Sequence, residues 1–110
     1  MFKHNEKIYL TGWFQYGVDF DPSKKTDLKP SYGSRDIFIT SFSLKGDYIK
    51  TLVLGGEQQD KSRALVIDKN DNLHLIGWFK GTIDFDFSDA KDHHTSKGLE
   101  DAFILRWHLE

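Results

Sequence analysis

The chain has 110 residues, 38% hydrophobic and 15% aromatic, so it is long and apolar enough to fold around a core and is not expected to be disordered. Its 15 basic and 17 acidic residues are interspersed and leave a net charge of −2, so we expect neither nucleic acid nor a membrane as a partner. The absence of cysteine excludes disulfides, zinc–thiolate sites and a cysteine nucleophile. No apolar stretch approaches the ~20 residues that a membrane-spanning helix needs.

Short apolar runs rich in β-branched and aromatic residues, separated by Gly, Asn, Asp and Ser, predict an all-β chain. Hairpin turns are expected at Leu44 to Asp47 and at Asp68 to Asn72, because these residues tolerate positive φ and bond their own backbone. In chain order, the expected strands are Ile8 to Phe14, Val18 to Phe20, Asp36 to Phe42, Tyr48 to Leu54, Arg63 to Asp68, Leu73 to Phe79, Ile83 to Phe85 and Ala102 to Trp107.

The sequence contains an internal repeat. Gly12-Trp13-Phe14 returns as Gly77-Trp78-Phe79, and about 15 of 39 positions are identical when the two copies are aligned without a gap at an offset of about 65 residues. We therefore expect a single β-propeller fragment over 1–110. Its first partial blade, with the connection that follows, spans 1–62, and its second partial blade spans 63–110. Each would be an incomplete four-stranded antiparallel meander, the first with a missing or stunted first strand and the second without its fourth.

Residues on both faces of the expected strands are apolar. Trp13 and Phe14 are adjacent and so point to opposite faces of a sheet, and Leu65-Val66-Ile67 is apolar throughout. Burial on both faces is typical of a propeller blade covered by its neighbours, whereas a sheet packed on one side alternates more cleanly. We expect propeller-like blades, and the alternative is a compact β-sandwich in which two sheets share one core.

The order of several short motifs resembles the bacterial β-propeller repeats known as SBBP repeats. The residues that carry this resemblance are Asp36-Ile37-Phe38-Ile39, Leu54-Gly55-Gly56, Asp60, Ala64-Leu65-Val66-Ile67-Asp68, Asn72 to Gly77 and, for one subgroup, Val18-Asp19-Phe20-Asp21-Pro22 with its second copy from Ile83. The sequence departs from the family at Asn72, which usually follows a Gly, and at Phe87, which stands where Pro22 stands in the first copy. The resemblance implies a segment of a larger, secreted or surface-exposed bacterial protein that uses its propeller as a scaffold. It implies no catalytic residues.

The doubled Asp-Phe-Asp motif is the strongest candidate for a ligand site. Residues two apart on a strand share a face, so Asp19 with Asp21, and Asp84 with Asp86, could offer oxygen ligands to calcium, with Asp27 or Asp89 nearby. Alternatively, these aspartates cap loops by accepting hydrogen bonds from backbone amides, which the repetition favours. Paired carboxylates also suggest glycoside hydrolysis, but no sequence feature raises the pKa of either carboxyl group.

Three further motifs have a structural and a functional interpretation. Asp68-x-Asn70-x-Asn72 resembles the start of a calcium loop but lacks the later ligands, so it predicts a hairpin turn. His93-His94 is expected in a polar loop, as a metal site or an incidental surface pair. The three tryptophans, Trp13, Trp78 and Trp107, could form a platform for sugar stacking or belong to the core.

These observations favour a non-enzymatic structural or interaction module, with a calcium- or carbohydrate-binding module as the alternative. We expect no catalytic residues and no cofactor beyond the calcium considered above. A ligand surface, for a protein or a carbohydrate, would lie in the variable segments 21–34 and 86–100. Self-association through blade edges and faces is expected, because few repeats bury their own faces. Residues 2–6 lack the apolar region of a signal peptide, so an export signal would lie upstream of this segment.

Overall fold

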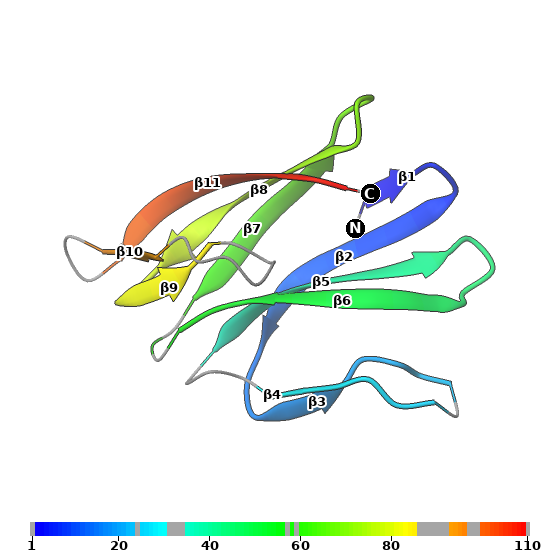
Figure 1. Ribbon diagram of the computed structural model, residues 1–110, viewed down its shortest axis with the longest axis horizontal. Helices are drawn as coiled ribbons and strands as arrows, with labels where there is room; N and C mark the ends of the chain where they lie inside the picture. The colour runs from blue at the N-terminus through cyan, green and yellow to red at the C-terminus, as the bar shows by residue number, and fades with distance from the viewer. Residues whose placement is uncertain are drawn as a thin grey trace.

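The computed structural model describes residues 2–23, 25–30, 35–56, 58, 60–85, 93–96 and 100–109, which form β-strands and turns (Figure 1). The all-β prediction is therefore confirmed. None of the described residues belongs to a helix, so none forms a helix long and apolar enough to cross a membrane. The strands are β1 (Phe2–His4), β2 (Lys7–Phe14), β3 (Gly17–Asp19), β4 (Leu28–Pro30), β5 (Asp36–Ser43), β6 (Tyr48–Leu54), β7 (Lys61–Ile67), β8 (Asn72–Phe79), β9 (Thr82–Asp84), β10 (His93–Thr95) and β11 (Asp101–His108).

Two antiparallel sheets make up most of the described structure. The first sheet has the strand order β1-β2-β5-β6, and the second has the order β11-β8-β7. Two small hairpins, β3–β4 and β9–β10, follow β2 and β8 respectively, and the β3–β4 hairpin projects below β6 in Figure 1. Each sheet is a meander whose hairpin insertion lies between its long strands, and neither closes into a barrel.

Two short strands, β4 and β10, were not expected from the sequence, whereas the three-residue β1 lies where a missing or stunted first strand was expected. The turn between β1 and β2 is a two-residue hairpin turn formed by Asn5 and Glu6, both at positive φ (48° and 61°). It lacks the glycine that is common in turns of this kind. Strands β4 and β10 lie in the variable segments that were expected to be loops. Each has only three residues and no alternation of apolar and polar residues, so pattern reasoning could not find them.

The main core lies between the two sheets. Tyr9, Ile37, Ile39 and Leu54 of the first sheet form one cluster with the inward residues of the second sheet, which are Leu65, Ile67, Leu73, Leu75 and Phe79, together with Ile83 and Phe85 of the adjoining hairpin. Strand β7 brings the sheets together, since it lies beside β2 (Figure 1). Inter-sheet hydrogen bonds also join them, among them the one from Thr11 Oγ1 to Ser62 Oγ (2.9 Å).

The expectation of burial on both faces is wrong for the second sheet. Leu65 and Ile67 are buried, but Val66 between them is 51% exposed. The same alternation runs along β8 and β11, because period-2 geometry sends every second side chain away from the core. We call the exposed side of this sheet the outer face; its apolar residues are Ala64, Val66, Ile76, Trp78, Ala102 and Ile104.

Candidate functional site

The feature best placed to bind a partner is strand β11. It pairs with β8 on one side, and no described strand lies on its other side. In the first sheet the strand at the corresponding repeat position is β5, which pairs with β2 on one side and with β6 on the other. An open strand edge presents a row of backbone donors and acceptors on which another strand can form.

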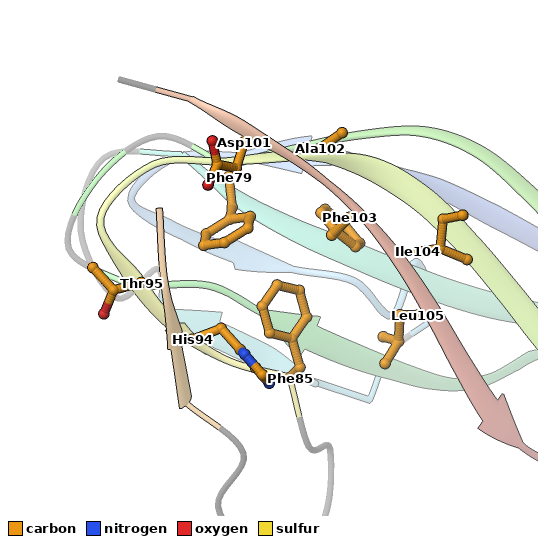
Figure 2. Close-up of a pocket in the computed structure, with 9 residues that line it drawn as sticks. All are labelled: Phe79, Phe85, His94, Thr95, Asp101, Ala102, Phe103, Ile104 and Leu105. Carbon is orange, nitrogen blue, oxygen red and sulfur yellow. The ribbon is translucent and has the colours of Figure 1, made fainter. Parts of the chain in front are cut away.

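A pocket of about 380 Å³ opens beside β11. Figure 2 shows the rings of Phe79, Phe85 and Phe103 converging in it, with Leu105 further along the strand. The Phe85 and Phe103 centroids are 5.1 Å apart, and Phe79 meets Phe85 edge-on at 5.2 Å. The remaining residues that line it are His94, Thr95, Asp101, Ala102 and Ile104. The aromatic walls are suited to apolar side chains, and His94, Thr95 and Asp101 add polar groups to the lining.

The first sheet has an aromatic cluster of the same geometry. Phe14 meets Phe20 edge-on at 5.2 Å, and Phe20 lies 5.0 Å from Phe38. The ring on the third strand also covers the glycine opposite it, Phe38 over Gly12 and Phe103 over Gly77. The Gly-Trp-Phe motif therefore has a packing reason, because the glycine leaves room for the ring of the neighbouring strand.

The sequence suggested that the paired histidines lie in a loop, and the structure shows that this is wrong. His93–Thr95 forms β10, which pairs with β9. The ring of His94 packs against Phe85, with centroids 5.6 Å apart, and both residues line the pocket (Figure 2). The side chain of His93 lies outside the described residues, so the metal interpretation rests on the sequence alone.

Asp19 and Asp21 hold the β3–β4 hairpin together. Asp19 Oδ1 accepts hydrogen bonds from the backbone amides of Asp21 (3.0 Å) and Asp27 (2.9 Å), and Asp21 Oδ1 accepts one from Ser23 (2.9 Å). These are loop-capping contacts. In the second copy Asp84 ends β9, but its side chain, Asp86 and Asp89 lie outside the described residues.

Asp27 belongs to a polar contact with the first sheet. Its carboxylate accepts a hydrogen bond from the Tyr48 hydroxyl and lies 3.2 Å from the Lys29 ammonium. The hydrogen bond from Tyr48 is the main reason that the pKa of Asp27 is lowered, while burial and the Asp27 contact raise the pKa of Tyr48 to about 12. Asp27 therefore stays ionised and docks the hairpin on β6.

The tryptophans do not form one platform. Trp78 pairs with Ala102 on the outer face of the second sheet, whereas Trp107 pairs with Leu73 and faces the core. Trp13 is on the first sheet, where it is 46% exposed and the Arg35 guanidinium lies 4.2 Å from its ring centroid. The core interpretation is thus wrong for Trp13, which forms a cation–π contact at the surface.

The sequence marks Asp60 only as one position of the pattern that resembles SBBP repeats, and the structure gives it a structural role. It is fully buried in the connection before β7; its carboxylate accepts hydrogen bonds from the amides of Gly56 (3.2 Å) and Lys80 (3.3 Å), and its own amide donates to Arg35 (2.8 Å). Burial, and next the nearby Asp36, raise the pKa of Asp60 to about 7 despite those hydrogen bonds. Its place after Gly55-Gly56 in that pattern was the available signal in the sequence.

The Asp68 motif forms the expected hairpin turn. Asp68 Oδ1 accepts hydrogen bonds from the amides of Asn70 (2.8 Å) and Asn72 (3.1 Å), and its other oxygen contacts His74 at 3.1 Å. These contacts lower the pKa of Asp68, the His74 contact most. Across the part of the chain that the structure describes, no group of three or more His, Asp or Glu side chains is arranged to hold a metal ion.

Comparison with family models, curated proteins and solved structures found no match to this chain. The resemblance of its motifs to SBBP repeats therefore stays an expectation from the sequence.

Proposed function

We propose that the chain is a non-enzymatic structural or interaction module, made of two blade-like units that stack against further units of the same kind. The observation that carries this proposal is the outer face of the second sheet. Ile104 on that face is 80% exposed, whereas Ile39, its counterpart in the first copy, is 3% exposed. The same position is covered in one unit and open in the other.

The difference arises because the first sheet packs against the second on this side, whereas no described strand covers the outer face of the second sheet. The side of the first sheet that carries Tyr9, Ile37 and Ile39 packs against the inward side of the second sheet. By the repeat offset, those three residues correspond to His74, Ala102 and Ile104 on the outer face. A third unit packed there would repeat the contact that already joins the first two.

Stacked units of this kind support the hypothesis of a β-propeller fragment, because each blade of a propeller is covered by its neighbours. The resemblance to bacterial propeller repeats supports the same hypothesis and, with it, a parent protein outside the cell or at its surface. An exposed apolar face is in addition a surface for self-association. We rank a calcium- or carbohydrate-binding role second, because Asp19 and Asp21 already serve backbone amides of their own hairpin.

The test is the mass of the protein in solution, measured by light scattering after size-exclusion chromatography, with and without calcium. We expect a mass above that of one 12.8 kDa chain, rising with concentration and unaffected by calcium. A monomer at every concentration would contradict stacking and favour a closed sandwich. A mass or melting temperature that rises only with calcium would instead favour the metal-binding alternative.

A further inference from the structure

We propose that the open edge of β11 binds an extended peptide strand, with an acidic residue at its N-terminal end followed by four apolar residues. The ligand would add to the second sheet as a fourth strand and fill the pocket shown in Figure 2. This inference goes beyond the stacking of whole units, because it concerns the edge of the sheet and not its outer face. It takes its register from a pairing within the same chain.

The pairing of β5 with β6 supplies the template. Antiparallel to β5, Leu54 lies opposite Ile37, Val53 opposite Phe38, Leu52 opposite Ile39 and Thr51 opposite Thr40. The repeat offset converts these four β5 positions into Ala102, Phe103, Ile104 and Leu105, which all line the pocket. A strand on β11 in the same register would therefore run along the pocket for four residues.

The side chains of β11 define what each position of the ligand should be. Opposite residues in an antiparallel pair share a face, so the position facing Phe103 enters the aromatic pocket and the position facing Ile104 extends the outer face. An apolar residue suits both. Pairing at Ile104 would also cover a side chain that is 80% exposed.

Two positions differ from the template, and they make the site distinct from that on β5. Thr51 Oγ1 donates a hydrogen bond to Thr40 Oγ1 (2.8 Å) in the first sheet, but Leu105 replaces that threonine in the second and favours an apolar partner. Lys50 lies opposite Ser41, whereas the corresponding β11 residue is Arg106, which is exposed and would repel a lysine. An acidic residue there would pair with Arg106.

The experiment uses two labelled synthetic peptides and fluorescence anisotropy with the full chain. One has the sequence of Asp47 to Gly55, and the other carries Lys50→Glu and Thr51→Val. We expect both to bind and the doubly changed peptide to bind about tenfold more tightly, since two cross-strand positions improve. The proposal would be overturned if neither peptide bound. Tighter binding of the unchanged peptide would also overturn it, because that result indicates exchange with β6 on the first sheet.

Protein variants locate the bound strand. Ile104→Asp places a charge beside the ligand and should weaken binding by about fivefold. Val66→Asp makes the same change on the same face but on β7, two strands away, and should leave the affinity unchanged. Both positions are exposed, so both variants should fold. Equal effects of the two variants would place the peptide on the outer face and not on the edge, and would overturn the proposal.

N-methylated peptides distinguish backbone pairing with β11 from nonspecific binding to an apolar surface. In an antiparallel pair only alternate residues direct their N–H groups toward the partner strand. Of two peptides N-methylated at alternate residues, one at odd and one at even positions, one should lose binding and the other keep it. Equal behaviour would exclude an added strand. If light scattering shows a dimer formed through β11 that the peptide does not dissociate, the proposal is likewise overturned. The stacking function is tested separately: a multimer that forms although neither peptide binds would support stacking while excluding the peptide site.

Discussion

Asp60 illustrates how burial at a single residue sets a dependence on pH. Its pKa is raised to about 7 in the folded chain, so the folded state holds a proton that the unfolded chain, with an ordinary value of 3.8, has already released. Stability from this group is therefore complete below about pH 4 and decreases as the pH rises to about 7. Above that value both states are ionised and the loss is constant.

We predict that Asp60→Asn flattens this dependence. The difference in free energy of unfolding between the original chain and the variant should change in favour of the variant as the pH rises from 4 to 7, by about 1.4 kcal/mol for each unit of the pKa difference. Urea denaturation at several pH values measures it. Taking the difference cancels the histidines and the carboxylates with lowered pKa, Asp27 and Asp68, which are present in both proteins. A constant difference across this range would contradict the raised pKa.

Asp19 tests the two interpretations of the Asp-Phe-Asp motif. Asp19→Ala removes the acceptor of two backbone amides, and we expect the melting temperature to fall by a few degrees. Asp19→Asn keeps the Oδ1 acceptor and should remain close to the original chain. Thermal unfolding with and without calcium gives the comparison. If calcium stabilises the original chain and the Asn variant loses that effect, Asp19 is a metal ligand and not a loop cap.

At the scale of secondary-structure elements, the glycines of the Gly-Trp-Phe motif occupy the same place in two strands but differ in their surroundings. A Cβ on Gly12 would lie 3.0 Å from the ring of Phe38, which can turn away. A Cβ on Gly77 would overlap the Lys61 carbonyl oxygen as well as meeting the ring of Phe103. The backbone is closer here because β7 shifts register between Ser62 and Ala64 as it passes β8.

We therefore predict that Gly77→Ala is more destabilising than Gly12→Ala, although the sequence motif is identical. The first change should lower the free energy of unfolding by about 2–3 kcal/mol and the second by about 1 kcal/mol or less, since overlap with backbone cannot be relieved by a side-chain rotation. Urea denaturation of the two variants checks the order. Equal losses would mean that the β7 irregularity does not constrain Gly77.

At the scale of the whole molecule, the proposed stacking would use the outer face of the second sheet. Ile76 lies at its centre, 40% exposed, between Ala64 on β7 and Ile104 on β11. We predict that Ile76→Glu lowers the mass in solution at a given concentration, because a charge there would have to lose its water when another unit packs on the face.

Leu44→Glu is the matched control for this change. Leu44 is similarly exposed but lies in the turn between β5 and β6, away from either sheet face. Its substitution should leave the mass unchanged, and circular dichroism should show that both variants keep their strands. Loss of association in both variants would indicate a general effect of added negative charge and would argue against the outer face as the interface.

Local pattern was sufficient for most of the elements of this protein. The all-β class, the positions of the long strands to within about two residues and the turn at Asp68 follow from apolar runs and turn residues, which act over a few neighbours in the chain. The offset of about 65 residues also shows which residues of one aromatic cluster correspond to those of the other. Pattern did not reveal β4 and β10, and it left open whether β1 exists, since three-residue strands have too few side chains to show a period.

Tertiary packing decided what the pattern left open. Val66 and Ile104 are as apolar as Ile67 and Ile39, and only the position of the neighbouring sheet determines which of them are buried. Asp60 acquires its raised pKa from the segments that enclose it, and β11 becomes an open edge because no described strand pairs beside it. Burial and pairing depend on residues far apart in the chain, whereas strand formation depends mainly on close ones. That is why the sequence alone determined the long strands of this protein and its tertiary structure determined the candidate site.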